Sequence, residues 1–240
     1  MAWLSIIVSV GVTWVASLYK ILNSSRSQSN SVFSRTGDKR NVLLVIAHPD
    51  DESMFFSPTI NYMTSRAHNV FILCMSTGNA DGMGNIRKDE LYRACAVFKV
   101  PPEHVKILDQ VDFQDGFGKV WNHNLLAKIV EEEVITHAID LVRSFVNNFL
   151  TETSRGNTEA WELISTNIFR KYSGPLDIWL SILSSAMHYP RGKFQCLLNE
   201  HPGKSFLAMS EHRSQWVWFR KLFVSFSSYS YVNTLRRINN

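Results

Sequence analysis

The sequence predicts an α/β fold, with a Rossmann-like, doubly wound and mainly parallel sheet preceded by an N-terminal transmembrane helix. Apolar runs at 42–46, 70–75 and 105–108 have the length and continuity of strands buried on both faces. Helical patterns separate them, and an apolar stretch of membrane-spanning length opens the chain. Such alternation of strand and helix is typical of a parallel sheet with helices on both faces.

Residues 1–22 are expected to form a membrane anchor. The stretch is almost wholly apolar, with Trp3, Trp14 and Tyr19 near its polar boundaries, and it is just long enough for a bilayer helix. A cleaved signal peptide is the alternative, but no basic segment precedes the stretch and its cleavage signal is poor. The nearby basic residues all follow the span, which by the positive-inside rule leaves the domain in the cytosol. They are Lys20, Arg26, Arg35, Lys39 and Arg40.

Residues 23–40 are predicted to be a flexible linker, because the stretch is rich in Ser and Asn. Residues 41–240 then form one domain, and a chain that is 45% hydrophobic and 19% charged can bury a sizeable core. The net charge of +4 is modest and its basic residues are dispersed, so no nucleic-acid groove is expected. Cys74, Cys95 and Cys196 are widely separated, which argues against a disulfide scaffold and fits a reducing compartment.

The elements between and after these strands are predicted from the helical spacing of apolar residues. One helix is expected around 91–98 and another around 125–134. The stretch 139–150 is ambiguous, because its apolar residues fit both a strand and a helical stripe. The later elements are expected to be a helix at 161–172, a strand or short helix at 176–183 and a closing helix at 206–216.

Near the end of the chain, apolar and aromatic residues are interleaved with Arg220 and Lys221. The segment is too short and too charged to span a bilayer. It either rests on lipid headgroups or packs as a core-facing helix followed by an edge strand. Its apolar members are Trp216, Trp218, Phe219, Leu222, Phe223 and Phe226.

The segment Ala47-His-Pro-Asp-Asp-Glu52 places an imidazole and three carboxylates directly after the first predicted strand. Pro49 followed by acidic residues favours a helix start, so the acids should gather at the carboxyl end of the strand, where active sites of open α/β sheets lie. His48 and Asp51 can ligate one divalent ion, and such a pair suits zinc. Asp50 can then take a proton from the metal-bound water. The alternative is a helix cap in which Asp50 or Asp51 binds exposed amides.

Together with four later segments, this one resembles the LmbE-like zinc-dependent de-N-acetylases, and more narrowly the N-acetylglucosaminyl-phosphatidylinositol de-N-acetylases of glycolipid anchor synthesis. The likeness extends from about Asn41 to Ile238. The ordered set is more specific than any single segment. The four are Ser76-Thr-Gly-Asn-Ala-Asp-Gly82, Arg87 with Glu90-Leu91, Gln114-Asp-Gly-Phe-Gly118 and Ser210-Glu-His-Arg-Ser-Gln-Trp216.

The resemblance implies an LmbE-like fold and a hydrolytic de-N-acetylase with zinc (Zn) as cofactor. His48 and Asp51 would hold the zinc, and Asp50 would be the general base. The substrate would be a glycolipid, an acetamido sugar on phosphatidylinositol. The protein would then lie in the endoplasmic reticulum membrane as a single-pass protein whose domain faces the cytosol. A deacetylase of another N-acetylglucosamine conjugate is the alternative with the same chemistry.

Three further residues are candidate substrate contacts through the resemblance. Arg87 would approach the substrate, although with Glu90 it also fits an exposed pair on one helix face. Asp115 fits either a turn residue or an acceptor for a sugar hydroxyl. His212 lies in a segment similar to the family's His-x-Ser-Gln and could help at the pocket. The loop 77–82 either lines that pocket with backbone amides or is an ordinary strand-to-helix loop.

One expected motif is absent. Members of the family carry a second motif, Gly-His-x-Asn-His, after a strand that resembles Ile139-Asp-Leu-Val142. It supplies the third zinc ligand and an acid or oxyanion-stabilising group. Here that strand is followed directly by Arg143-Ser-Phe-Val-Asn-Asn-Phe149, and family-like sequence resumes at Asn157-Thr-Glu-Ala-Trp161. No His stands between His137 and His188.

The domain is therefore expected to be internally truncated near 142–157, with an incomplete site. A catalytic zinc normally has three protein ligands and an open position. His123, His137 and His212 are conceivable substitutes, but an isolated His is more often an ordinary surface or core residue, so none is assigned. The expected result is weak zinc binding and slow hydrolysis. The alternative is a catalytically deficient isoform that binds or regulates an active enzyme.

Overall fold

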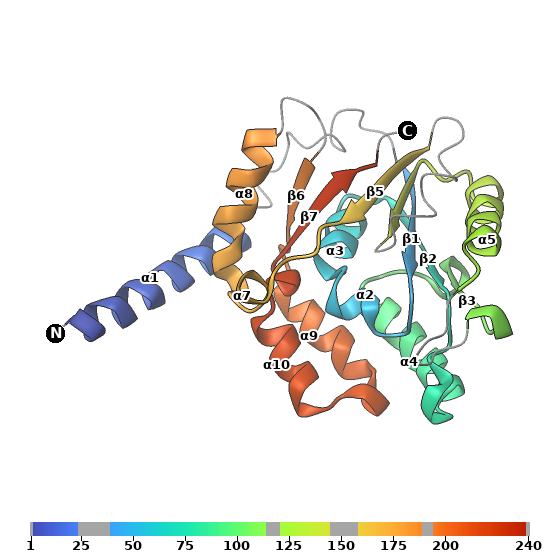
Figure 1. The fold of residues 1–240 in the computed structure, drawn as a ribbon, viewed down its shortest axis with the longest axis horizontal. Coiled ribbons are helices and arrows are strands. Elements are labelled where there is room, and N and C mark those ends of the chain that lie inside the picture. Colours follow the sequence, from blue (N-terminus) through green and yellow to red (C-terminus); the bar gives the residue numbers. More distant parts are fainter. Residues whose placement is uncertain (1, 24–38, 114–120, 145–157, 189–193, 239–240) are drawn as a thin grey trace.

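The structure, a computed structural model, describes residues 2–23, 39–113, 121–144, 158–188 and 194–238. These residues form a seven-stranded sheet in the order β3-β2-β1-β4-β5-β7-β6 (Figure 1). The strands are β1 (Asn41–Ile46), β2 (Asn69–Cys74), β3 (Val105–Ile107), β4 (Leu141–Ser144), β5 (Glu159–Leu163), β6 (Phe194–Leu198) and β7 (Val232–Arg237). The α-helices are α1 (Ala2–Leu22), α2 (Asp51–Met54), α3 (Ser57–Ser65), α4 (Gly84–Val97), α5 (His123–Thr136), α7 (Ile168–Lys171), α8 (Asp177–His188), α9 (Pro202–Glu211) and α10 (Trp218–Phe226).

The sheet is mainly parallel, as the sequence predicts. The neighbours β3, β2, β1, β4 and β5 are parallel, and β7 lies antiparallel between β5 and β6. Strands β2 and β3 are added in turn on one side of β1, and β4 then lies on the other side of β1. The strand order therefore reverses between β1 and β4, and ligands of open α/β sheets bind at the carboxyl ends of such strands. The doubly wound fold class is confirmed.

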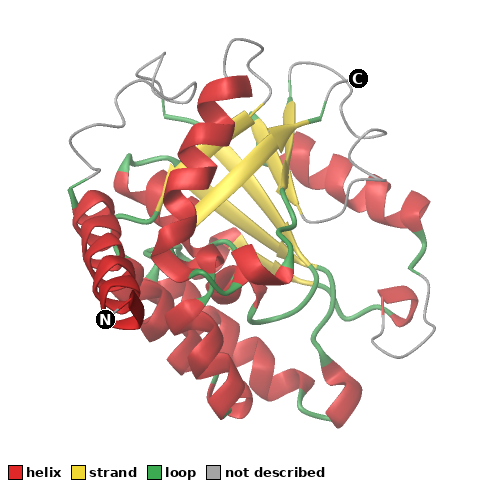
Figure 2. Cartoon of the chain, turned by 60° about the vertical axis from the view of Figure 1, so that its left-hand side comes forward, coloured by secondary structure: helices red, strands yellow, loops and turns green. Residues whose placement is uncertain are grey.

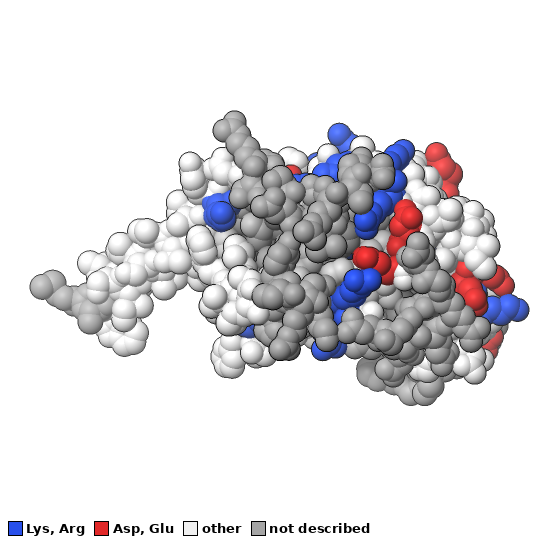
Figure 3. Space-filling model, turned by 90° about the horizontal axis from the view of Figure 1, so that it is seen from above, with Lys and Arg blue, Asp and Glu red and all other residues white. Residues whose placement is uncertain are grey.

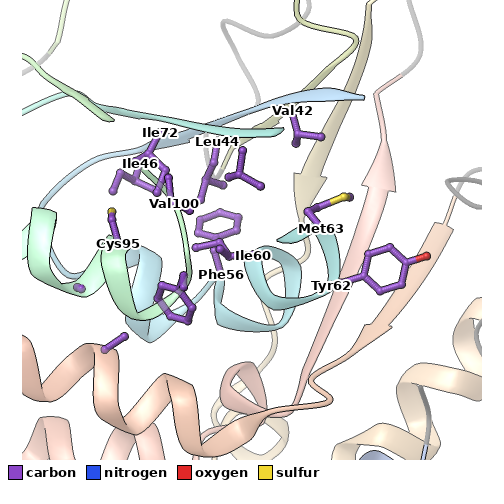
Figure 4. Close-up of a cluster of buried hydrophobic side chains, with 14 of the residues drawn as sticks. Val42, Leu44, Ile46, Phe56, Ile60, Tyr62, Met63, Ile72, Cys95 and Val100 are labelled. Carbon is purple, nitrogen blue, oxygen red and sulfur yellow. The ribbon is translucent and has the colours of Figure 1, made fainter. Parts of the chain in front are cut away.

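Strand β1 is buried on both faces, which explains its continuous apolar sequence. On one face Val42, Leu44 and Ile46 belong to a cluster that includes side chains of α3, α4, α9 and α10 (Figure 4). On the other face Leu43 and Val45 pack with side chains of α5. Each buried aliphatic side chain contributes about 1.5–3 kcal/mol relative to an exposed one. The two helical layers thus hold β1 in the middle of the molecule.

Helix α1 packs on the domain only through its last turns. Ile21 is fully buried in a small cluster with Ile178 of α8, and Trp179 Nε1 donates to Ser17 Oγ at 2.9 Å. The rest of the helix projects from the domain (Figures 1 and 2). Contact with α8 thus determines the direction in which α1 leaves the domain.

Within the described chain, Trp3–Leu22 is the one helix long and apolar enough to cross a membrane. The projecting part shows neither acidic nor basic side chains in the view of Figure 3. Membrane anchors and N-terminal signal sequences share this length and composition, so the anchor stays a prediction.

Some later elements differ from the prediction. The helix expected at 161–172 is wrong, because Trp161 is fully buried in β5 between β4 and β7, and only Ile168–Lys171 is helical. The stretch 176–183 is helical, because Leu176 ends a 3₁₀ turn (Gly174–Leu176) and 177–183 lie in α8. In the ambiguous stretch 139–150, Leu141–Ser144 form β4, and the residues after 144 lie outside the described ones. Strand β6 has no predicted counterpart, and β7 is an interior strand rather than an edge strand.

Candidate functional site

The segment after β1 brings His48, Asp50 and Asp51 together at the carboxyl end of the parallel sheet. Asp50 has a positive φ of 132° with ψ −21°, which is strained for a residue with a Cβ. Its backbone N donates to Glu52 Oε2 at 3.0 Å, and this bond holds the turn. Strain of this kind costs on the order of 1–3 kcal/mol and clusters at functional sites.

Asp51 Oδ2 ties the turn to the end of β1. It accepts from Ala47 N at 3.0 Å and from His48 N at 2.9 Å. Burial, reinforced by repulsion from Asp50, raises the pKa of Asp51 to about 6. The His48 ring is half-buried and meets the edge of Trp121, with ring centroids 6.1 Å apart. The turn thus carries the His48 imidazole and the Asp51 carboxylate, three residues apart, directly after β1.

Two arginines hold the Asp50 carboxylate. Arg220 from α10 donates to Asp50 Oδ2, and Arg87 Nη2 from α4 lies 3.4 Å from the same oxygen. Burial raises the pKa of Asp50, and the positive charges of Arg220 and Arg87 oppose that shift. Arg87 therefore lies beside Asp50 rather than Glu90, and its contact with substrate stays a prediction. Sequence reasoning missed Arg220, although its spacing from Phe223 and Val224 indicates the inward face of α10.

Glu52 and His212 form a fully buried ion pair behind this carboxylate. His212 Nε2 lies 2.7 Å from Glu52 Oε1, which also accepts from Ser53 Oγ at 2.6 Å. Burial opposes both charges, yet the pKa of Glu52 is lowered by His212 and that of His212 is raised by Glu52. In this geometry His212 positions the turn that carries Asp50, and a direct contact with substrate stays a prediction.

Arg87 is itself positioned by the loop after β2. Its guanidinium donates to Gly78 O at 3.0 Å and to Pro49 O at 2.8 Å. Gly78 has φ +67°, and a Cβ there would lie 2.2 Å from Arg87 Nη1. Only glycine fits this close approach without displacing the arginine. Glu90, predicted as the partner of Arg87, instead accepts from the backbone and hydroxyl of Ser214 at 2.8 and 2.6 Å.

A polar cavity of about 230 Å³ opens at the carboxyl ends of β2 and β3, beside the His48 turn. Thr77 Oγ1 donates to Asp109 Oδ1 across it at 3.4 Å. Side chains, rather than backbone amides alone, therefore present hydroxyl, amide and carboxylate groups to a ligand. Asp115 lies outside the described residues. The polar lining is Ser76, Thr77, Asn79, Asp109 and Gln110.

His48 and Asp51 stay candidate zinc ligands. His48 and Asp51 are the right donor types, and the hydrogen bonds from the turn use only Asp51 Oδ2. Across the described ranges, however, no group of three or more His, Cys, Asp or Glu side chains could hold a metal. These residues therefore do not form a complete zinc site by themselves.

The three alternative histidines do not complete it. His123 is exposed at the start of α5. His137 stacks on Phe71 with centroids 4.5 Å apart, and its carbonyl accepts from Asn41 at the opposite end of β1. His212 binds Glu52. The end of β4 lies beside the end of β1, since Ser144 is the register partner of Val45.

Comparisons with known proteins agree with this fold and segment order. The family model "PIG-L: GlcNAc-PI de-N-acetylase" matches residues 43–149. A Bos taurus N-acetylglucosaminyl-phosphatidylinositol de-N-acetylase is 35% identical over 83% of this chain and 84% of its own length. A Dictyostelium discoideum protein with the same name, given as probable, is 32% identical over 88% of this chain and 98% of its own.

Solved structures show the same fold at low identity. A deacetylase of teicoplanin biosynthesis in complex with teicoplanin superposes with a TM-score of 0.53 at 12% identity, covering 83% of this chain and all of that one. The zinc-inhibited form of teicoplanin deacetylase gives a TM-score of 0.52 at 10% identity, covering 83% and 99%. With sequence identity of 32–35% to two curated relatives over most of its length, the chain belongs to the GlcNAc-PI de-N-acetylase family.

Proposed function

We propose that this chain acts in the hydrolytic de-N-acetylation of N-acetylglucosaminyl-phosphatidylinositol during glycosylphosphatidylinositol anchor biosynthesis, with an incomplete catalytic site. The observation that carries the proposal is the grouping of His48, Asp50 and Asp51 at the strand-order reversal. They lie there in a chain whose relatives bear the name of that activity. The acetamide of the glycolipid would lie over this turn, and its products would be acetate and a glucosamine lipid.

Asp50 is the proposed general base. Its buried carboxylate accepts the proton of the attacking water, and Arg220 and Arg87 keep the carboxylate oriented. The Glu52 and His212 pair maintains the strained turn from behind. Arg87, Asp115 and His212 are the proposed substrate-side residues, and the polar cavity near Asp109 suits sugar or inositol hydroxyls.

Zinc is the proposed cofactor, held by His48 and Asp51. When bound, it would polarise the amide carbonyl and lower the pKa of a bound water. The third ligand is absent from the described residues, and the family's second His motif is absent from the sequence. These two observations favour a second candidate function, a catalytically deficient isoform that binds the glycolipid or an active enzyme.

The proposed organisation is a membrane anchor at 1–22, a linker at 23–40 and a de-N-acetylase domain at 41–240, truncated near 142–157. The contact of α1 with α8 and the basic residues after the span support this arrangement. The proposed location is the endoplasmic reticulum membrane with the domain in the cytosol, where the glycolipid substrate is a partner in the same bilayer.

The test is acetate release by the purified full chain from two substrates, N-acetylglucosaminyl-phosphatidylinositol in vesicles and a soluble N-acetylglucosamine conjugate. We expect slow release from the glycolipid only, abolished by Asp50→Asn. Asp140→Asn, at the opposite end of β1, is the matched control and should leave the rate unchanged. Faster release from the soluble conjugate would identify another substrate. Equal rates for the chain and its Asp50→Asn variant would favour the deficient isoform.

A further inference from the structure

Helix α10 has an unusual division of faces. Arg220, Phe223 and Val224 point inward to the site and core. The opposite face is apolar and exposed, with Trp218 71% and Phe219 54% accessible. An exposed helix face of a globular domain is normally polar, and clustered exposed apolar side chains mark an interaction surface.

The end of α10 approaches α1 through the segment between α7 and α8. Tyr172, directly after α7, meets the buried Phe223 of α10, with ring centroids 6.4 Å apart. Gly174 lies between α10 and α1, because a Cβ there would stand 3.4 Å from Phe226 O and 3.6 Å from Trp14 Nε1. Figure 1 shows α7 between α8 and α10 on the side from which α1 projects. The end of α10, where Phe226 is 49% exposed, thus lies next to the base of the candidate anchor.

Helices α7 and α8 add exposed apolar side chains to the same side. Arg170 links these helices, since its guanidinium donates to both carboxylate oxygens of Asp177 at 2.7 and 3.0 Å. We use the term lipid-facing surface for the exposed apolar residues of α10, α7 and α8. Its main members are Trp218, Phe219, Leu222, Phe169, Leu180 and Leu183.

We propose that the lipid-facing surface rests on the headgroup layer of the bilayer that α1 enters, as a second membrane contact of the domain. The helices are too short to span, but aromatic side chains with nearby cations suit the interface. Lys171 Nζ lies 5.0 Å from the Phe223 ring and Lys221 Nζ 5.3 Å from the Trp216 ring. These lysines can reach lipid phosphates while the exposed rings of Trp218 and Phe219 enter the acyl boundary.

The contact has a consequence for the site that rests on the proposed function. Arg220 binds Asp50 from the same short helix whose other face meets lipid. Contact of α10 with the bilayer would therefore hold the reacting end of the sheet at headgroup level. A glycolipid could then reach Asp50 without leaving the membrane.

The test uses the full chain in vesicles of phosphatidylcholine and phosphatidylinositol. A polarity-sensitive fluorophore is attached at Phe219→Cys or Leu222→Cys, and the matched control is Ile135→Cys. Ile135 is an equally apolar residue, 74% exposed on α5 across the sheet from α10. Native thiols should react little, because burial raises the pKa of Cys74 and Cys95 well above the usual value and that of Cys196 to about 12. The unsubstituted chain measures that background.

We expect blue-shifted emission and strong quenching by headgroup-labelled nitroxide lipid at Phe219→Cys and Leu222→Cys, and neither at Ile135→Cys. Quenching at the control's level would overturn the proposal. A blue shift without lipid quenching would also overturn it, by assigning the surface to a second copy or a protein partner. The fluorescence measurement needs neither zinc nor turnover. If it contradicts the membrane contact, the proposed function still stands. If the chain proves inactive, the fluorescence result is unchanged.

Discussion

Adjacent acidic residues of the His48 to Glu52 turn have different partners and therefore different tasks. Asp51 accepts two backbone N–H groups, Asp50 binds two arginines, and Glu52 binds His212. The sequence alone identifies the cluster but cannot assign these partners, because Arg220 and His212 come from elements about 160 to 170 residues away. The tertiary fold thus decides which carboxylate remains available for chemistry.

The buried Glu52 and His212 pair should be important for stability. We predict that His212→Ala lowers the free energy of unfolding by about 3–5 kcal/mol, because removing one partner leaves a buried, unpaired charge. Arg93→Gln breaks the exposed pair with Glu211, 3.5 Å apart, and should cost at most about 1 kcal/mol. Urea unfolding of both variants measures the difference. Equal losses would show that Glu52 does not need His212.

Gly78 provides a second residue-level prediction. Gly78→Ala should destabilise the protein by more than about 1 kcal/mol and displace Arg87, because of the positive φ and the close approach of the guanidinium. Gly203→Ala is the control, since no heavy atom lies within 4 Å of its Cβ position. Because alanine favours a helix over glycine, this change in α9 should raise the free energy of unfolding by up to about 1 kcal/mol. Urea midpoints distinguish the two. A neutral Gly78→Ala would contradict the steric argument.

At the level of elements, the sequence predicts the strands that are buried on both faces. It misses elements whose type depends on tertiary packing. Strands β1 and β2 are apolar throughout because both faces are covered, so their pattern is unambiguous. The sequence predicts a helix in place of β5, because Trp161 is followed by the exposed apolar residues Ile168 and Phe169, whose spacing continues a helical stripe. Helix α10 fits both predicted alternatives, with one face in the core and one exposed.

The correction at β5 is testable through tryptophan. Trp161→Ala should lower the free energy of unfolding by about 3–5 kcal/mol, because it opens a cavity between β4 and β7. Trp218→Ala removes the same side chain from an exposed position and should change stability by no more than about 0.5 kcal/mol. The free energies of unfolding of the two variants are measured with urea in the same detergent. Similar losses would contradict the placement of β5.

On the scale of the whole molecule, one edge of the sheet brings the functional features together. The reversal of strand order between β1 and β4 places the His48 turn and the end of β4 at one point. The residues that follow β4 should supply the missing ligand in full-length relatives. The fold and half of the site were thus predictable from sequence, whereas the arginine and histidine partners were not.

The proposed topology places this edge in the cytosol. We predict that protease added to intact microsomes removes the domain, because the basic residues follow the span and favour the cytosolic side. A lumenal protein in the same microsomes should stay protected, which checks their integrity. Protection of the domain until detergent is added would contradict the topology.

The most direct test of the account compares zinc content and acetate release with and without the absent motif. Purified full chain is measured beside a chain carrying a Gly-His-x-Asn-His segment inserted between β4 and β5, and beside the same insertion with both His changed to Ala. Losing a residue that merely supports a ligand costs about 10 to 100-fold, so loss of a ligand itself should cost more. We predict that the chain as written binds far less than one zinc and releases acetate more than about 100-fold more slowly than the His-containing insertion. Stoichiometric zinc and a comparable rate in the unmodified chain would contradict the account.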